Sequence, residues 1–392
     1  MNLSRVFHPV GQGAFFTEMF YGEDECFTVV YDCGTKSKPG VQLKQQIHDA
    51  FAYEHHPIDL FFISHLDDDH VNGISCLIDN GYLNEYTTIV LPFCDNYQIE
   101  LYEIDKSRIV SSVFSVLRAH HFHKIFFVPV KEDADSEGRM VDVRELSEKL
   151  GEEVTIMGLN GTLIRDNLVL TYNGIWEYVP FTMNDEASKD FFRKIEESTI
   201  VTLQDIQDVY DNVLKYGIRH NEKLKELKRI YNEVGDRRKK DTLININSLV
   251  VLSQSIQSVK HNDIIMEYGC RSFPIYHLNC NGRVNGRVSE SAACVYTGDL
   301  NLKDDSDFEH FERSIMRYAK KGIDLIQIPH HGSVTSYNIR LTHGNSISCF
   351  TNFDSNKKIF NRDLLMDFAL AHKPLFLITE YYDSKFVQEI SV

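Results

Sequence analysis

The stretch from Phe61 to His70 carries the densest group of chemically active side chains in the chain. Two imidazoles, His65 and His70, and two carboxylates, Asp67 and Asp69, fall within a few residues of one another. Mixed nitrogen and oxygen donors of this kind suit divalent metal ions. The same residues also fit an acidic, solvated loop that caps the next helix, because aspartate is common at helix starts. The rest of the sequence decides between a metal site and a cap.

Two later segments end in the same types of side chain. The apolar segment Ala292–Tyr296 is followed by Asp299, and the segment Ile323–Pro329 is followed by His330 and His331. Short apolar runs like these predict buried strands, and loops on a rigid scaffold are where functional side chains concentrate. One such strand end is easily an accident, but three in one chain are hard to explain as turns. We therefore expect these loops to meet in one metal site.

Six short motifs in these and neighbouring segments resemble the metallo-β-lactamase superfamily. The superfamily signature, His-x-His-x-Asp-His, occurs here with Asp67 at the place of the second histidine. This His-x-Asp-x-Asp-His form resembles the hydrolase domain of ComEC-type DNA-uptake proteins. The other matching motifs occur in the expected order and are Val10–Gly13, Asp32–Gly34, Asn247–Val250, Thr297–Asp299 and His330–Ser333. The membrane domains of ComEC are absent from the sequence, so the resemblance does not imply DNA uptake.

The resemblance implies two divalent ions, zinc or manganese, held by the side chains of His65, Asp67, Asp69, His70, Asp299, His330 and His331. His65 and Asp67 would hold the first ion. Asp69, His70 and one histidine of the 330–331 pair would hold the second ion, and Asp299 would bridge both. The residues expected to be essential for catalysis are Asp69, His70 and Asp299.

Residues outside this ligand set are expected to support it. Asp32 would steady the cluster from behind the ligands. The usual third-motif histidine of the superfamily is missing, because Asn247 and Ser248 occupy that strand, so the first ion has fewer protein ligands. A ligand set rich in carboxylates favours harder ions such as manganese, although zinc also fits. Ser333 and Ser336 either donate hydrogen bonds to a phosphate or cap their own loop.

The chemistry expected of such a centre is hydrolysis. Two metal ions about 4 Å apart would turn a bridging water into the nucleophile and neutralise charge on substrate oxygens. Phosphodiester hydrolysis suits this best, so we expect a phosphodiesterase or nuclease that acts on nucleic acid or a nucleotide. Two alternatives stay open. One is a hydrolase of lactam, lactone or thioester substrates, and the other is a catalytically weak sensor or scaffold of the same fold.

Strand and helix patterns alternate in two β-rich halves, residues 1–130 and 242–392. Between them, residues 131–241 read as a mainly helical insertion, because apolar residues recur at helical spacing from Asn184 to Val234. Helices between the strands of each half predict an α/β fold of two stacked sheets with outer helices, in four layers. The resemblance makes this the αββα sandwich of the metallo-β-lactamases, interrupted by a helical insertion.

The composition is that of a soluble globular protein, with 43% hydrophobic and 25% charged residues and no apolar run of membrane-spanning length. The eight cysteines are scattered without close pairs, which favours reduced thiols and a cytoplasmic location. The net charge of −16 argues against sliding along nucleic acid. A basic run is a weak candidate for substrate contact, and it consists of Arg237, Arg238, Lys239 and Lys240. If that run is only a solvated face, the helices before it are expected to dock a protein partner or a second copy of the chain.

Overall fold

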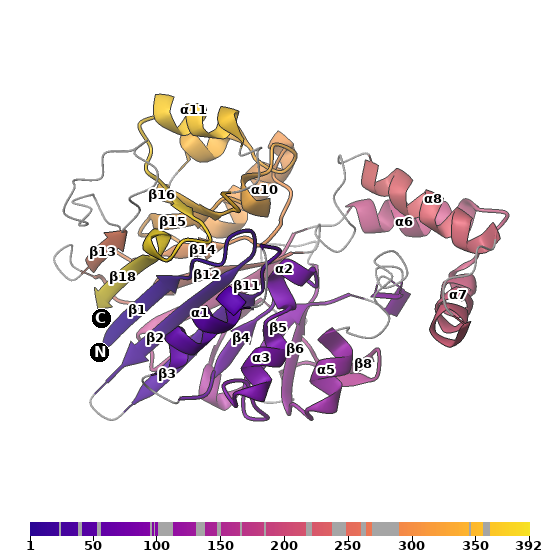
Figure 1. Ribbon diagram of the computed structural model, residues 1–392, viewed down its shortest axis with the longest axis horizontal. Coiled ribbons are helices and arrows are strands. Elements are labelled where there is room, and N and C mark those ends of the chain that lie inside the picture. The colour runs from indigo at the N-terminus through magenta and orange to yellow at the C-terminus, as the bar shows by residue number, and fades with distance from the viewer. Residues whose placement is uncertain are drawn as a thin grey trace.

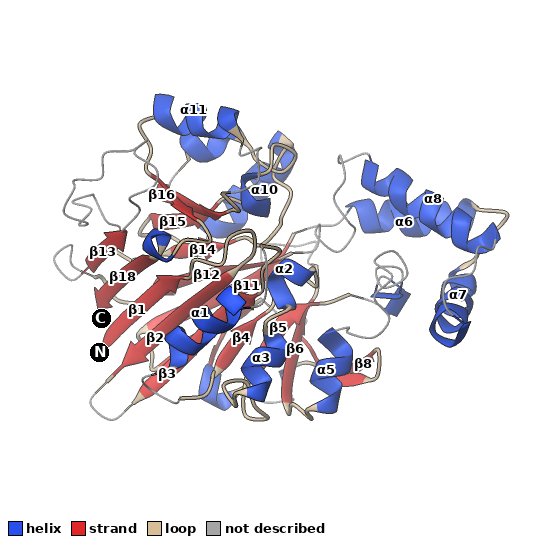
Figure 2. Ribbon diagram, viewed as in Figure 1, coloured by secondary structure: helices blue, strands red, loops and turns tan. Residues whose placement is uncertain are grey.

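The computed structural model describes most of the chain in two mixed β-sheets and the helices around them (Figures 1 and 2). The described residues are 1–22, 25–37, 41–52, 56–94, 96–97, 99–100, 113–130, 138–146, 150–164, 167–183, 186–216, 222–236, 248–259, 264–268, 290–344, 346–355 and 361–392. Within them, no helix is both long and apolar enough to cross a membrane.

The larger sheet has ten strands. Their order is β13 (Ile264–Tyr268), β18 (Phe386–Ser391), β1 (Asn2–Phe7), β2 (Phe15–Tyr21), β3 (Cys26–Cys33), β4 (Leu60–Phe62), β5 (Thr88–Pro92), β6 (Lys124–Val128), β9 (Leu159–Leu163) and β8 (Glu152–Ile156). Strands β1, β2 and β3 pair antiparallel, whereas β3 to β6 run parallel. The loops that follow β3 and β4 therefore leave the same edge of the sheet, the edge at which open α/β sheets bind ligands.

The second sheet has eight strands. Their order is β17 (Leu375–Ile378), β16 (Ser346–Asn352), β15 (Ile323–Gln327), β14 (Cys294–Tyr296), β12 (Leu249–Ser255), β11 (Trp176–Thr182), β10 (Leu168–Tyr172) and β7 (Arg139–Asp142). Strands β14 to β17 are parallel. The loops after β14 and β15, which carry the expected ligands, thus also leave one edge together.

Helices cover the outer face of each sheet (Figure 1). The larger sheet packs against α1 (Val41–Phe51), α3 (Ile74–Asp79) and α5 (Val113–Ala119), with the short α2 (Asp68–Val71) beside α3. The second sheet packs against α10 (Asp305–Met316) and α11 (Arg362–Leu370). Short 3-10 turns are η1 (Val143–Glu145), η4 (His330–Gly332), η5 (Ile339–Thr342) and η6 (Tyr382–Ser384).

Helix α10 shows how the sequence builds an outer layer. Its first turn carries Asp305 and Asp307, whose negative charge is favourable at a helix N-terminus. Phe308, Phe311 and Ile315 recur at helical spacing and are all buried against the second sheet. The same spacing predicts a helix over Phe308–Lys320 from the sequence alone, and the observed helix starts three residues earlier and ends four residues earlier.

Aromatic side chains fill the space between the two sheets. Phe7 of β1 stacks on Phe350 of β16 with ring centroids 4.1 Å apart, and Tyr31 of β3 stacks on Tyr296 of β14 at 4.9 Å. Offset and tilted ring pairs of this kind add to the stabilisation from buried apolar area. Tyr31 immediately precedes Asp32, so this packing fixes the end of β3 against the end of β14, where the candidate site lies.

A buried ion pair of the larger sheet is hydrogen-bonded to residues of the second sheet. Arg5 of β1 and Glu18 of β2 are 2.6 Å apart, and the Arg5 side chain is 0% exposed. Tyr178 and Tyr296 of the second sheet each donate a hydrogen bond of 2.8 Å to Glu18. Arg5 in turn donates to the carbonyl oxygen of Ala292 at 3.0 Å. Both charges are therefore compensated inside the core, as buried charges must be.

Helices α6 (Glu186–Glu197), α7 (Leu203–Tyr216) and α8 (Glu222–Asp236) form a small bundle to one side of the sheets (Figure 1). Phe191 and Leu227 lie in its apolar core, and Tyr97 and Met157 of the main body pack against that core. The bundle therefore docks beside the β8–β9 end of the larger sheet.

The helical part of the expected insertion is shorter than the range 131–241. Strands β7 to β11 precede it and belong to the two sheets. The segment Val143–Leu150, which has helical character in sequence, contains the 3-10 turn η1 and a 3-10 residue at Leu150, and its described residues include no α-helix. Strand β8 is exposed at three of its five positions, so it lacks the apolar run that reveals a strand. The division into domains stays a prediction. Among the described residues, the α-helical part of the expected insertion begins with α6 at Glu186.

Candidate metal centre

Three loops from the two sheets meet at the candidate site. His65 lies just beyond β4, and Asp69 and His70 are on α2, which follows it. Asp299 follows β14, and the pair His330 and His331 forms η4 after β15. The loops are tied together by backbone hydrogen bonds of 2.8 Å from Leu249 N to Ser64 O and 3.1 Å from His330 N to Gly298 O. The expected meeting of these strand ends is therefore observed.

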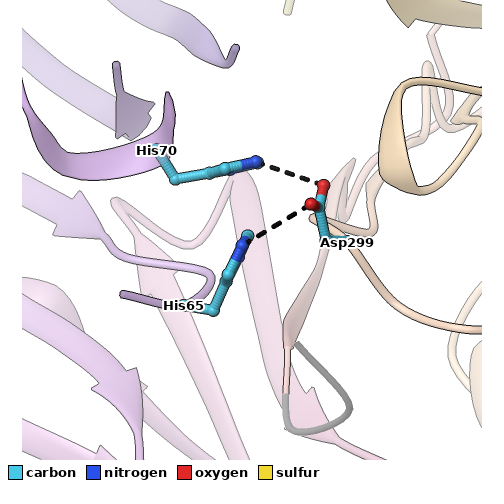
Figure 3. A group of neighbouring side chains, drawn as sticks. All are labelled: His65, His70 and Asp299. Carbon is cyan, nitrogen blue, oxygen red and sulfur yellow. Dashed lines mark ion pairs between the residues drawn. The ribbon is translucent and has the colours of Figure 1, made fainter. Parts of the chain in front are cut away.

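The carboxylate of Asp299 faces the imidazole rings of His65 and His70 (Figure 3). Its Oδ1 is 3.1 Å from Nε2 of His70 and 3.7 Å from Nε2 of His331. Its Oδ2 is 3.7 Å from Nε2 of His65 and 3.6 Å from Nε2 of His330. Each oxygen of this one carboxylate thus faces two imidazole nitrogens. The bridging role expected of Asp299 stays a prediction, because Asp299 belongs to only one of the two ligand groups that the structure contains.

Two overlapping groups of side chains could each hold a metal ion. His65, His70 and Asp299 form one group, and Asp69, His70 and His331 form the other, with the ligand atoms of each within 4.8 Å of one another. Asp69 Oδ2 is 3.2 Å from Nε2 of His331. His70 belongs to both groups, whereas the sequence assigned it to the second ion alone.

The inward-facing atoms are buried and lack the hydrogen bonds that buried polar atoms need. His65, Asp69, His70 and Asp299 are all at most 1% exposed. Within the described residues, no hydrogen bond satisfies Nε2 of His65, His70 or His331, or either carboxylate oxygen of Asp299. Buried polar atoms without a partner are costly and rare, and a bound ion would supply the missing partner. The donor set therefore fits divalent cations.

Each imidazole is held from behind through its other nitrogen. Nδ1 of His70 is 2.7 Å from Oδ2 of Asp32, and Nδ1 of His65 is 2.9 Å from Oγ of Ser64. Nδ1 of His330 is 3.1 Å from Oγ of Ser336, and Nδ1 of His331 is 3.2 Å from the carbonyl oxygen of Asn352. A hydrogen bond at Nδ1 fixes the ring orientation and leaves Nε2 for a ligand.

Asp32 supports more than His70. Its Oδ1 accepts a hydrogen bond of 2.7 Å from the backbone of Ser64, and its Oδ2 accepts one of 2.6 Å from the Ser64 hydroxyl. Asp32 has a φ of 55°, in the left-handed region that is uncommon for residues other than glycine. Backbone strain of this kind persists where the surrounding structure holds it and often accompanies a functional site. His330 and His331, with φ of 51° and 52°, show the same strain.

One glycine accounts for the motif Asp32–Gly34. A Cβ on Gly34 would lie 2.5 Å from the carbonyl carbon of Asp69 and 2.6 Å from the backbone nitrogen of His70. Any larger residue would therefore push α2 away from β3 and shift both ligand side chains.

Burial and neighbouring charges set the protonation of the group. Burial, together with nearby His70, lowers the pKa of His65 to about 4. Burial would also lower the pKa of His70, but the carboxylates of Asp299 and Asp32 outweigh it and hold that pKa well above its ordinary value. Burial opposes ionisation of Asp299, yet His330, His70 and His331 hold its pKa well below the usual range. The carboxylates are thus ionised and ready to bind a cation, whereas His70 must lose a proton first.

Some residues that the sequence assigns to the site are not among the two ligand groups, and others lie outside the described residues. Asp67 is 4% exposed and precedes α2 at its N-cap position, but it is in neither group of ligand atoms. Ser333 Oγ lies 2.8 Å from Oγ1 of Thr335, so it bonds within its own loop. Asn247 and the basic run 237–240 lie outside the described residues. Assignment of individual ligands stays a prediction.

Sequence reasoning missed three supporting residues. Ser64 directly precedes His65, so its place beside the first ligand could have indicated a supporting role. Ser248 Oγ accepts a hydrogen bond of 3.2 Å from the backbone of Asp299, whereas the sequence showed only that it lies on the strand of the missing histidine. Asn352 ends β16, far from any motif, and gave no signal.

No protein-family model and no curated protein matches the sequence. Among solved structures, the chain is similar to an archaeal metallo-β-lactamase superfamily protein from Sulfolobus tokodaii, with 13% sequence identity and a TM-score of 0.20, over 60% of this chain and 96% of that chain. A likeness of this size assigns no family. The structure itself contains two features that the resemblance implies. They are two mixed sheets and a buried group of histidine and aspartate side chains.

Proposed function

We propose that this chain is a metal-dependent hydrolase that cleaves phosphodiester bonds in nucleic acid or nucleotides. The observation that supports it most is the Asp299 carboxylate, whose two oxygens each face a pair of imidazole nitrogens. Two divalent ions bound there would activate water and neutralise charge on phosphate oxygens. The fold that fits this site is the four-layer αββα sandwich of the metallo-β-lactamases, with α6–α8 as its insertion.

The chain's own residues divide the work of building this centre. His65 and His330 face one side of Asp299, and His70 and His331 face the other. Both members of the 330–331 pair are thus candidate ligands, and His330 takes the place left by the missing third-motif histidine. The His330 side chain is 25% exposed, so it is the member of the pair that solvent reaches more easily.

The expectation of a hard ion comes from the signature. Asp67 replaces its second histidine, and Asn247 and Ser248 occupy the strand of the third-motif histidine, so we expect manganese to support more activity than zinc. Each ligand group itself pairs two imidazoles with one carboxylate, a donor set that also suits zinc. The ComEC-like signature points to the same phosphodiester chemistry, and lactam, lactone or thioester substrates are the competing class.

The test is a metal-dependent activity panel. The protein is stripped with a chelator and reconstituted with manganese or zinc. It is then assayed on bis(p-nitrophenyl) phosphate, single-stranded and duplex DNA, RNA, a β-lactam, a lactone and a thioester. Hydrolysis of phosphodiesters that depends on added metal supports the proposal. Turnover of only the lactam, lactone or thioester overturns the substrate class, and metal binding without any turnover favours a sensor or scaffold.

Two further assignments follow from the sequence and extend this proposal. The scattered cysteines favour the cytoplasm, and the six that the structure describes are free thiols. The α6–α8 bundle is expected to bind nucleic acid through the basic run 237–240, or else to dock a protein partner or a second copy of the chain.

A further inference from the structure

Lys36 places a positive charge at the edge of the candidate metal centre. It follows β3 by three residues, and its Nζ is 2.7 Å from Oδ1 of Asp69. Asp69 is fully buried, whereas the Lys36 side chain is 42% exposed. The ammonium group thus lies at the boundary between the buried ligands and solvent. Oδ2 of Asp69 faces His331 instead, so the two oxygens of this carboxylate have separate partners.

The backbone around Lys36 is held firmly to the helix that carries the ligands. Thr35 N donates a hydrogen bond of 3.1 Å to Oδ1 of Asn72, and Nδ2 of Asn72 donates one of 2.8 Å to Thr35 O. Lys36 N donates to Gln12 O at 2.7 Å. Asn72 follows α2 directly, so Lys36 and Asp69 belong to one rigid unit. Such support is typical of a side chain whose position matters for binding.

An ion pair in this position contributes little to folding. A lysine that is nearly half exposed gains only a small free energy from one carboxylate, because solvent screens the charge. Folding therefore does not account for a lysine fixed at this point. The chain as a whole carries a net charge of −16, so an anionic substrate must overcome repulsion. A cation at the solvent-exposed edge of the site can attract and orient such a substrate.

We propose that Lys36 is a substrate-binding residue whose ammonium group contacts an anionic oxygen of a phosphodiester at this site. This inference rests on the proposed phosphodiesterase function and names one residue that selects its substrate. The Lys36 side chain reaches the ligands from the solvent side and keeps its three hydrogen-bond donors on a flexible stem. A neutral ester would gain nothing from this contact.

The experiment compares Lys36→Gln with Lys36→Arg and with a matched control, Lys44→Gln. Lys44 is an exposed residue of the neighbouring helix α1, so its loss changes the net charge equally. All proteins are reconstituted with manganese. The measurements are manganese content, binding of inorganic phosphate by calorimetry, KM and kcat for bis(p-nitrophenyl) phosphate, and thermal midpoint.

We expect Lys36→Gln to weaken phosphate binding and raise KM by about ten-fold, because a charge-assisted hydrogen bond is lost. Its manganese content and thermal midpoint should match the wild type. Lys36→Arg should recover most of the phosphate binding, and Lys44→Gln should change nothing.

The outcomes separate this inference from the function beneath it. Wild-type phosphate binding in Lys36→Gln overturns the role of Lys36 alone. Loss of manganese or a large fall in thermal midpoint in Lys36→Gln shows that the residue is structural, which also overturns it. If the manganese-loaded wild type neither binds phosphate nor cleaves the diester, the proposed function fails and this inference fails with it.

Discussion

Nδ1 of His70 lies 2.7 Å from Oδ2 of Asp32, and both side chains are fully buried. This contact joins the end of β3 to the helix α2 and fixes the direction in which His70 presents its Nε2 to Asp299. The same carboxylate oxygen accepts the hydroxyl hydrogen of Ser64, so one aspartate orders two neighbours of the candidate ligands.

The Asp32→Asn substitution tests this support. The asparagine amide oxygen can still accept the hydrogen bond from Ser64 N, but the negative charge beside Nδ1 of His70 is lost. The His70 ring then loses the partner that fixes its orientation. We expect metal affinity to fall by about 10- to 100-fold, the usual effect of losing a partner of a ligating histidine. Competition with a metal-binding dye measures the affinity. An unchanged affinity, with an unchanged circular dichroism spectrum, would show that Asp32 does not support the site.

Separate alanine substitutions of His330 and His331 test whether both histidines serve the centre. The structure places them on opposite oxygens of Asp299, so each should remove part of the metal from a different position. We expect both single variants to hold less metal than the wild type, and the double variant to hold least. Full metal content in His330→Ala, with loss only in His331→Ala, would show that His331 is the only metal ligand of the pair.

The pH dependence of metal binding follows from His70. Its pKa lies well above the ordinary value, so His70 carries a proton near neutral pH and must lose it to bind a metal. Metal affinity should therefore rise as pH increases through neutrality, by about ten-fold per pH unit for one released proton. Calorimetry in two buffers of different ionisation enthalpy counts that proton. Affinity that stays flat from roughly pH 6 to roughly pH 8 would contradict a protonated His70.

His65 behaves in the opposite way in the metal-free protein. Its pKa is lowered to about 4 in the folded chain, below its value in the unfolded chain. The unfolded chain then binds more protons between about pH 4 and 6.5, so stability should fall as pH decreases through that window. Asp299 loses its own contribution at lower pH still, because its folded pKa is depressed. His65→Gln should flatten the first part of this fall in urea unfolding curves.

For the buried ion pair of Arg5 and Glu18, we predict an effect on stability alone. Arg5→Met leaves Glu18 without its cation inside the core, although the Tyr178 and Tyr296 hydroxyls still donate to it. We expect a loss of about 3–5 kcal/mol in the free energy of unfolding. The double variant Arg5→Met, Glu18→Gln should recover part of this loss, because no unpaired charge remains. A double variant less stable than Arg5→Met would show that the unpaired charge is not the cause of the loss.

Much of the candidate site could be predicted from the sequence because its residues follow apolar strands. His65, Asp299 and His331 each come directly after such a run, and parallel strands release their loops at one edge. The sequence could not show which carboxylate oxygen faces which imidazole, because that depends on how the two sheets stack. It also gave no reason to separate Asp67 from the other acidic residues of its loop.

The parts that could not be predicted depend on contacts between distant segments. Lys36 is one of many surface-type lysines in sequence, and only the packing of β3 against α2 brings it to Asp69. The strands within 131–185 lie partly at sheet edges, where polar residues face solvent and obscure the apolar pattern. By contrast, the only tryptophan of the sequence, Trp176, is predicted from its residue type to pack in the core. It is fully buried, and its Nε1 donates a hydrogen bond of 2.9 Å to Ser253.

The buried group around Asp299 is expected to hold metal and to use it for phosphodiester hydrolysis. The most direct measurement is manganese content by mass spectrometry together with hydrolysis of bis(p-nitrophenyl) phosphate, on the wild type and on Asp69→Asn and His70→Ala. We expect about two ions per chain and metal-dependent turnover in the wild type. Both variants should keep the fold, because their side chains lie outside the sheet cores, but lose metal and turnover. Wild-type metal content and turnover in either variant would contradict this account.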